Sequence, residues 1–135
     1  MTATYQLEVA TPERLLVREQ VSEAQIPAAN GYLGVLPGHA PLLSELGIGE
    51  LTYIVDGQRR SLTVSAGWVE VLPDKTRVLA TDAEKASEID MARAEAALKR
   101  AQDRLSHPAA DLDVARALNA AKRANVRLRC AKTQQ

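Results

Sequence analysis

Four arginines in the last third of the chain have a spacing that suits phosphate binding. Arg93 and Arg100 are seven residues apart, about two helical turns, so a helix would place both on nearly the same face. Arg123 and Arg127 would lie one turn apart on a second helix. Guanidinium groups bind phosphate through bidentate, charge-assisted hydrogen bonds. If the two helices face each other, the four side chains could converge on a polyphosphate; otherwise they are ordinary surface charges.

A second basic feature follows Val114. From that residue onward the chain has no acidic side chain, and it carries Arg116, Lys122, Arg123, Arg127, Arg129 and Lys132. Such a segment is either a solvated basic face or a surface for an acidic partner. Basic charge also attracts nucleic acid, but no stacking aromatic residues or docking motif accompany this segment. We therefore predict no nucleic-acid partner.

The sequence shows no constellation typical of catalysis or metal binding. Its two histidines, His39 and His107, and its single cysteine, Cys130, have no zinc-ligand spacing. No set of Ser, His and acid occurs in a known motif, and neither common phosphate-binding glycine pattern is present. By itself the pair of Asp90 and Arg93 is a helix-surface ion pair, worth only about 0.2–0.5 kcal/mol. We expect no catalytic or metal site, and we interpret His39 as a turn or interface residue.

The composition changes along the chain in a way that predicts two domains. All seven glycines lie at or before Gly67, and fourteen alanines lie at or after Ala86. The first part is net acidic and the second net basic. We place the domains at residues 1–84 and 87–135, and we expect them to face different partners because their charges are opposite.

Apolar residues of the first domain recur with period two, which is typical of strands with one buried face. Inward positions are expected at Leu7, Val9, Leu15, Val17, Ala24, Ile26, Leu51, Tyr53, Val55, Leu62, Val64, Ala66, Val69 and Val71. Asp56-Gly57 and Pro73-Asp74 are turn signals between such runs. Roughly eight to ten short strands must stack or close to cover their edges, so we predict a β-sandwich or flattened barrel.

The second domain has helical spacing. Ser87 and Asp90 resemble a capping box, and apolar residues then recur at steps of three and four from residue 91 to residue 105. A Ser-His-Pro segment ends this helix, and Asp111 is placed to cap a second one. We predict an antiparallel α-helical hairpin. Because its seam is mostly alanine, it buries little apolar area and could open.

The stretch GYLGVLPGHAPLL, at residues 31–43, must form a series of tight bends. Its glycines accept positive φ angles and its prolines fix φ, so the tip of the turn is expected at Pro37-Gly38-His39. The apolar residues of the stretch predict that the bends pack on a core, and they are Leu33, Val35, Leu36, Leu42 and Leu43.

Four segments together resemble the epsilon subunit of F-type ATP synthases of the bacterial type, over nearly the whole chain. They are VATPER near the start, GYLGVLPGHAPLL, SAGWVEVLPDK at residues 65–75, and Ile89-Asp90-x-x-Arg93-Ala94. The chain departs from the pattern at Tyr32, where relatives often have an acidic residue, and at Ala66, where they often have glycine. The resemblance implies a β-sandwich and a helical hairpin in a subunit that is not itself an enzyme.

The resemblance also implies a component of a rotor. The first domain would bind the gamma subunit and rest on the membrane-embedded c-ring of the proton-translocating complex, and the implied contact residues are Tyr32, Pro37, Gly38 and His39. We expect neither a secretory signal nor a spanning segment, so any membrane contact would be indirect. The implied location is peripheral, on the cytoplasmic face of the plasma membrane, with a thylakoid membrane as the alternative.

Two roles are implied for the second domain. Ile89-Asp90-x-x-Arg93-Ala94 is similar to an ATP-binding motif of several bacterial epsilon subunits, and the implied ATP site comprises Glu84, Ile89, Asp90, Arg93, Ala94, Arg100, Arg123 and Arg127. Asp90 would accept from the adenine amino group and Ile89 would pack on the ring, with ATP as a regulatory ligand and no required cofactor. The second helix would contact the alpha and beta subunits and inhibit ATP hydrolysis through Arg116, Lys122, Arg123, Arg127 and Arg129.

Two other classes of protein remain as alternatives. An independent β-sandwich enzyme or ligand-binding protein would need a concave cluster of polar catalytic groups, and the sequence offers none. An RNA-binding adaptor would use the basic helix, and its binding would be sensitive to salt.

Overall fold

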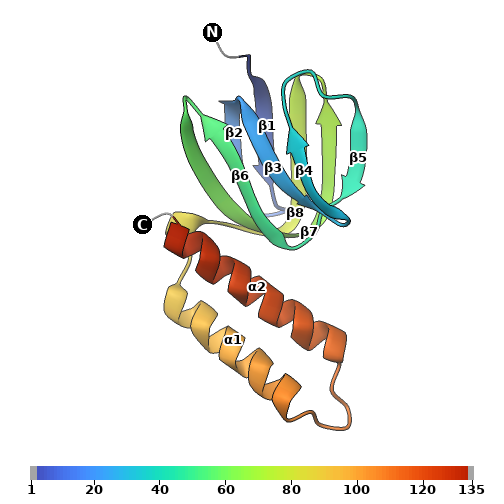
Figure 1. The fold of residues 1–135 in the computed structure, drawn as a ribbon, viewed down its shortest axis with the longest axis vertical. Helices are drawn as coiled ribbons and strands as arrows, with labels where there is room; N and C mark the ends of the chain where they lie inside the picture. Colours follow the sequence, from blue (N-terminus) through green and yellow to red (C-terminus); the bar gives the residue numbers. More distant parts are fainter. Residues whose placement is uncertain (1–2, 134–135) are drawn as a thin grey trace.

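The computed structural model describes residues 3–133. Its strands are β1 (Tyr5–Ala10), β2 (Leu15–Val21), β3 (Glu23–Ala28), β4 (Gly31–Val35), β5 (Leu42–Glu45), β6 (Gly49–Val55), β7 (Gln58–Leu72) and β8 (Lys75–Lys85). A short 3-10 helix, η1 (Ala86–Glu88), leads to α1 (Met91–Ser106) and α2 (Val114–Thr133). Figure 1 shows two antiparallel helices below the strand domain, with α2 next to the strands. The predicted β-sandwich followed by a helical hairpin is confirmed.

The strands form one sheet that folds into two layers. Its order is β2-β1-β8-β7-β6-β3-β4, and β5 pairs with the second half of β7. The pairing of β1 with β8 is parallel, whereas β7 pairs antiparallel with β5, β6 and β8. Tyr5 joins the two layers, because its hydroxyl in β1 donates to the Val35 carbonyl in β4 at 2.9 Å. The aliphatic core lies between the layers.

A kink in β7 lets this one strand serve both layers. Ala66 and Gly67 have φ angles of 58° and 122°. Positive φ angles are unfavourable for residues that have a Cβ atom, and glycine adopts them most readily. Before the kink β7 pairs with β6, and after it with β5. Residues with even numbers, Leu62 and Val64, face the core before the kink. Residues with odd numbers, Val69 and Val71, face it after the kink.

The alternation of apolar residues gives most of the core correctly. Ala66 is exposed at the kink, and Leu15 is a second exception. Its side chain is 53% exposed, while its neighbours Leu16 and Val17 are buried. The register shifts at this point, because Val9 pairs with Val17 while Ala10 pairs with Leu15. Leu16 is the extra residue of a β-bulge, which turns Leu15 to the outer face.

The segment between β4 and β5 forms the predicted turn, since the backbone N–H of His39 donates to the Leu36 carbonyl at 3.2 Å. The prediction that its apolar residues pack on the core is wrong for three of them. Leu36, Leu42 and Leu43 are exposed, whereas Val35 is buried. Leu36 lies in the loop after β4, and Leu42 and Leu43 lie in β5, a short edge strand whose strand pairing in the described part of the chain is with β7.

Both helices begin at caps other than those predicted. Asp90 alone caps α1 by accepting from the N–H of Arg93 at 3.1 Å, and Asp113 caps α2 by accepting from the N–H of Arg116 at 3.0 Å. Ser87 lies in η1, and Asp111 lies two residues before the cap of α2. A capping side chain must reach an N–H two or three residues further on, which places the cap directly before the first helical residue.

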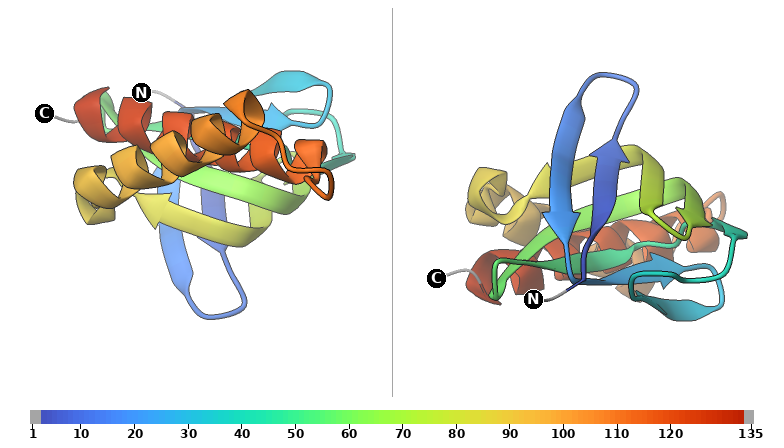
Figure 2. Two further views of the ribbon diagram at one scale, coloured as in Figure 1. Left: turned by 90° about the horizontal axis from the view of Figure 1, so that it is seen from below. Right: turned by 90° about the horizontal axis from the view of Figure 1, so that it is seen from above.

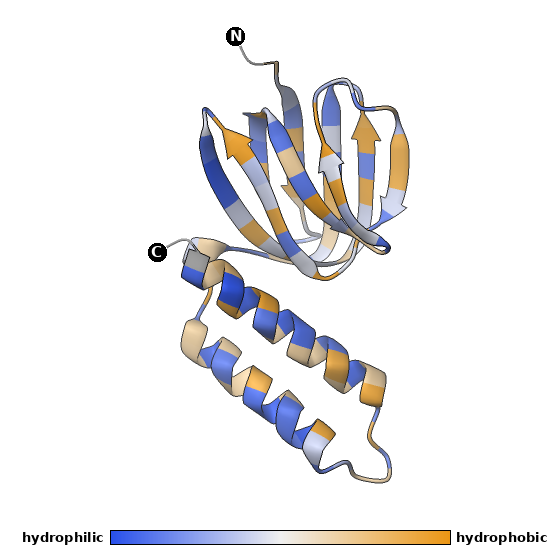
Figure 3. Cartoon of the chain, viewed as in Figure 1, coloured by the Kyte–Doolittle hydropathy of each residue, from blue (hydrophilic) through white to orange (hydrophobic). Residues whose placement is uncertain are grey.

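The contact between the hairpin and the sandwich combines hydroxyl groups of the sheet with three small or medium apolar residues of α2, which are Val126, Cys130 and Ala131. The seam between the helices is alanine, as predicted, with Ala94, Ala101, Ala117 and Ala124 buried. Toward the strands, α2 covers a face that includes the buried hydroxyls of Thr52, Ser61 and Thr63. Figure 3 shows how hydrophilic the helices are, and Figure 2 shows them lying over β7 and β8 while the β1–β2 hairpin extends beyond them. Little apolar area therefore holds the hairpin in place.

No helix within residues 3–133 is both long enough and apolar enough to cross a membrane.

Gly67→Ala should destabilise the sandwich strongly. Its φ angle of 122° disfavours any side chain, and a Cβ atom there would overlap the carbonyl oxygen of Leu79 on the neighbouring strand. We expect the free energy of unfolding, measured in urea, to fall by roughly 2–4 kcal/mol. Ala66→Gly is the matched control, which should be neutral or stabilising by up to about 1 kcal/mol because it relieves a positive φ. An unchanged stability of Gly67→Ala would contradict this account of the kink.

Candidate functional site

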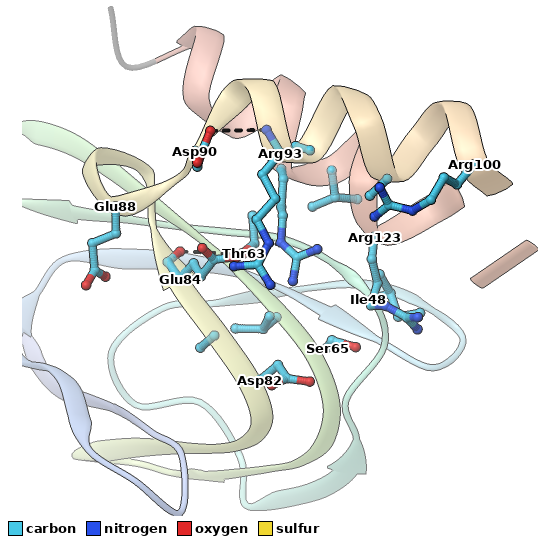
Figure 4. A pocket seen from close by; sticks show the side chains of 16 residues that line it. Ile48, Thr63, Ser65, Asp82, Glu84, Glu88, Asp90, Arg93, Arg100 and Arg123 are labelled. Carbon is cyan, nitrogen blue, oxygen red and sulfur yellow. Dashed lines mark hydrogen bonds and ion pairs between the residues drawn. The ribbon is translucent and has the colours of Figure 1, made fainter. Parts of the chain in front are cut away.

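A pocket of about 430 Å³ lies where the hairpin meets the sandwich (Figure 4). Its walls come from β7, β8, the linker and both helices. Seven of the eight residues of the predicted ATP site line it: Glu84, Asp90, Arg93, Ala94, Arg100, Arg123 and Arg127. A volume within roughly 300–1,000 Å³ is typical of small-molecule sites.

Ile89 is the one residue of the predicted ATP site that does not line this pocket. It lines a separate groove of about 530 Å³, together with Leu16, Val17 and Met91. The linker is extended at Ile89 and Asp90, whose ψ angles are 123° and 102°. Successive side chains of an extended segment point to opposite sides, so Ile89 and Asp90 face different cavities.

Three arginines on the helix wall are free to bind an anion. Arg93 and Arg100 extend from α1 and Arg123 from α2. None of the three forms an ion pair with any residue of the described part of the chain. The small side chains of Ala94 and Ala97 line the same wall and leave space between the guanidinium groups. This wall can therefore bind a ligand with several negative charges.

Arg127 differs from the other three because it is already paired. Its Nε donates to Glu84 Oε1 at 2.5 Å, and both side chains are 33% exposed. This ion pair connects α2 to β8. Nearby, Cys130 is buried against the Ser61 hydroxyl at 3.5 Å, and burial raises the pKa of its thiol. The C-terminal half of α2 is thus the part that attaches the hairpin to the sandwich.

Asp90 retains one oxygen for a ligand. Its Oδ1 caps α1, and no other hydrogen bond or ion pair joins its side chain to residues 3–133. A carboxylate oxygen of this kind accepts from an amino or hydroxyl group.

Nine residues that the motif does not include also line the pocket, and the polar ones among them are Thr63, Ser65, Asp82 and Glu88. Thr63 and Ser65 pair with Glu84 and Asp82 across β7 and β8. One signal in the sequence points to Asp82, because residues i and i−2 of a strand share a face and Glu84 was already predicted. Thr63 and Ser65 could not be found in this way, because only the pairing register of β7 with β8 places them beside Glu84 and Asp82.

The basic residues of α2 do not form a single surface. Only Arg123 and Arg127 line the pocket. Lys122 and Arg129 line another groove of about 530 Å³, beside the β3–β4 turn, and Arg116 is exposed at the start of the helix.

The four residues predicted to contact the ring or gamma subunit lie at two separate places. Tyr32 shares a groove with α2, and its hydroxyl accepts from the N–H of Glu50 at 3.2 Å. Pro37-Gly38-His39 lies beyond the other end of β4, where the N–H of Gly38 donates to the Pro73 carbonyl at 2.9 Å.

Glu88 fixes the linker to the sandwich. Both of its oxygens accept from Arg14, at 2.7 and 2.9 Å, and Oε1 also accepts from the N–H of Lys85 at 3.0 Å. The hydrogen bond with Arg14, with a smaller effect of the Lys85 N–H, lowers the pKa of Glu88 to about 2. A residue 74 positions away in the sequence thus sets where the hairpin leaves the sheet.

The fold and the pocket define a two-domain protein, in which a β-sandwich and a helical hairpin enclose an arginine-lined site. Two family models match consecutive parts of the chain: the beta-sandwich domain of the ATP synthase Delta/Epsilon chain at residues 4–86, and its long alpha-helix domain at residues 87–132. The chain belongs to the family of ATP synthase epsilon chains.

Relatives within this family are close in sequence. The ATP synthase epsilon chain of Solibacter usitatus is 63% identical over 109 residues, which cover 81% of each chain. That of Koribacter versatilis is 51% identical over 105 residues, which cover 78% of this chain and 74% of the relative.

Solved structures share the fold at lower identity. A chain of the Euglena gracilis mitochondrial ATP synthase, in a structure of its OSCP, F1 and c-ring, has a TM-score of 0.80 and 22% identity over 91% of this chain and 78% of its own. A chain from the central stalk and c-ring of the Tetrahymena thermophila enzyme has a TM-score of 0.57 and 16% identity over 98% of this chain and 97% of its own.

Arg14→Ala should raise the pKa of Glu88 from about 2 toward the ordinary value of 4.5. Because folding lowers the pKa of Glu88, the pair of Arg14 and Glu88 stabilises the folded protein above about pH 4.5. This stabilisation is lost as the pH falls toward 2. A side-chain NMR titration of Glu88 measures the shift. Arg18→Ala removes an exposed arginine that contacts Glu8 instead, and it should leave Glu88 unchanged. A Glu88 pKa that stays near 2 without Arg14 would refute the assignment.

Proposed function

We propose that this protein is the epsilon subunit in the central stalk of a bacterial-type F-type ATP synthase, a non-catalytic rotor component whose helical hairpin binds ATP. Membership of the family supports the place in the complex. The observation that carries the ATP proposal is the pocket between hairpin and sandwich, in which Arg93, Arg100 and Arg123 have no carboxylate partner among residues 3–133. Three free guanidinium groups suit a triphosphate.

An apolar row on the outer face of the sandwich supports binding to the gamma subunit. Cross-strand pairs join Trp68 to Leu79, Leu79 to Ala10, and Ala10 to Leu15 over four neighbouring strands. Trp68, Leu79 and Leu15 are each more than half exposed. Contiguous exposed apolar surface of this kind marks a protein interface.

The turn at Pro37-Gly38-His39 suits the contact with the c-ring. It lies at the end of the sandwich away from the hairpin (Figure 1), and the neighbouring Leu36 and Leu43 are exposed. Contact with the membrane would then pass through the ring, on the cytoplasmic face of the plasma membrane.

Binding of ATP would favour the closed hairpin. A ligand in the pocket touches β8, α1 and α2 at the same time, and it loses these contacts when the hairpin leaves. A ligand that binds one state more tightly shifts the equilibrium toward that state. The small apolar area between α2 and the sandwich would make this equilibrium accessible.

The open hairpin would inhibit ATP hydrolysis. Release of α2 exposes Arg123 and Arg127, which then join the residues that are already outside the pocket: Arg116, Lys122 and Arg129. We propose that this basic helix binds acidic segments of the alpha and beta subunits and restrains rotation. Low ATP would therefore favour the inhibited state.

Titration of the isolated chain with ATP tests the binding proposal. We expect saturable NMR shifts or heat, and a dissociation constant at least about tenfold weaker for Arg93→Gln and Arg123→Gln, because each loses a charge-assisted contact with phosphate. Arg129→Gln is the matched control, since this arginine of α2 lies outside the pocket, and it should bind as the wild type does. Absence of any response at millimolar ATP would refute the proposal.

Inhibition is tested in the assembled enzyme at low ATP. Deletion of residues 88–135 should raise the rate of hydrolysis, because no helix then reaches the catalytic subunits. The full-length triple variant Arg116→Gln, Lys122→Gln, Arg129→Gln should also raise it while leaving the pocket intact. An unchanged rate with both variants, each shown to be incorporated, would contradict an inhibitory role.

A further inference from the structure

The strand wall of the pocket carries two polar side chains that the ATP motif does not include. Ser65 of β7 and Asp82 of β8 are cross-strand partners, so both side chains leave the sheet on the same face. Both line the pocket, and Figure 4 shows them on the wall opposite α1. Neither side chain forms a hydrogen bond or ion pair with any of residues 3–133.

The pocket has a charge asymmetry that orients a ligand. The helix wall presents the free guanidinium groups of Arg93, Arg100 and Arg123, whereas the strand wall presents Asp82 and Glu84. Arg127 neutralises Glu84, but no cation within the described chain pairs with Asp82. Phosphates are attracted to the first wall and repelled by the second. A nucleotide bound through its phosphates to the arginines would therefore turn an uncharged part toward Asp82.

That uncharged part must offer hydrogen-bond donors, because an ionised carboxylate only accepts. The ribose of a nucleotide offers two adjacent hydroxyl groups, which match the two oxygens of a single carboxylate. Acidic side chains bind ribose hydroxyls in this way in dinucleotide-binding folds. The hydroxyl of Ser65 beside Asp82 can donate or accept, so it can complete the same contact.

We propose that Asp82, assisted by Ser65, binds the ribose hydroxyl groups of the nucleotide, so that the pocket selects ribonucleotides over 2′-deoxyribonucleotides. This inference rests on the proposed ATP site and adds a specificity-determining pair to it. Removal of the 2′-hydroxyl leaves one carboxylate oxygen without a donor, which weakens binding by about tenfold for a charge-assisted hydrogen bond.

The test compares ATP, 2′-deoxy-ATP and inorganic tripolyphosphate as ligands of the full chain, in EDTA and again with Mg²⁺. The wild type should bind ATP about tenfold more tightly than 2′-deoxy-ATP. Asp82→Ala should bind the two nucleotides within about twofold of each other and should leave tripolyphosphate binding no weaker, because the removed charge repels phosphate. Ser65→Ala should reduce the preference for ATP. Asp74→Ala is the matched control, an exposed acidic residue in the β7–β8 turn, and it should keep the full preference.

Several outcomes would overturn the proposal. Equal binding of ATP and 2′-deoxy-ATP to the wild type would do so, as would a preference that persists in Asp82→Ala. A loss in Asp82→Ala that is equal for both nucleotides and occurs only with Mg²⁺ would assign Asp82 to a metal ion instead of ribose. If neither ATP nor tripolyphosphate binds the wild type, the proposed ATP site itself fails, which distinguishes that failure from failure of the ribose contact.

Discussion

The positive φ angles at Ala66 and Gly67 are the constraint on which both the sandwich and the pocket depend. In a regular strand, successive side chains point to opposite faces, so even-numbered residues share one face and odd-numbered residues share the other. With the kink, β7 can place Val64 and Val69 in the same core although one position is even and the other odd. The residues just before the kink, Thr63 and Ser65, then face away from the core and toward the hairpin. The close approach to the carbonyl of Leu79 explains why one of the two kink residues is glycine.

The two domains are held by forces of different strength. The sandwich has a continuous aliphatic core, in which residues such as Leu7, Leu51 and Val78 are fully buried. The hairpin has an alanine seam and contacts the sheet through hydroxyl groups, the Glu84–Arg127 ion pair and a few apolar side chains of α2. Partly exposed ion pairs of this kind add little net stability. The sandwich thus has a large aliphatic core of its own, whereas less apolar area attaches the hairpin to it.

The pocket lies at the boundary between these two parts, and this position suits a regulatory ligand better than a reacting substrate. Its groups come from the sheet on one side and from the two helices on the other. Binding of the proposed ligand would therefore be linked to the position of the helices, and its concentration would set the population of the closed state. The clamp between Arg14 and Glu88 holds the linker on the sheet side, so movement is expected in the helices beyond it.

Seven of the eight residues that the family resemblance implied for the ATP site line the pocket. The sequence by itself determined the types of the elements, their order and the tip of the β4–β5 turn, because these depend on local periodicity and turn chemistry. It did not determine which faces those elements show to one another. The bulge that exposes Leu15, the open edge that exposes Leu43, and the extended linker that sends Ile89 away from Asp90 are visible only in the tertiary structure. The same holds for Ser65, which reaches the pocket through the register of β7 with β8. Register and layer contacts join residues far apart in the chain, and a local pattern carries no information about them.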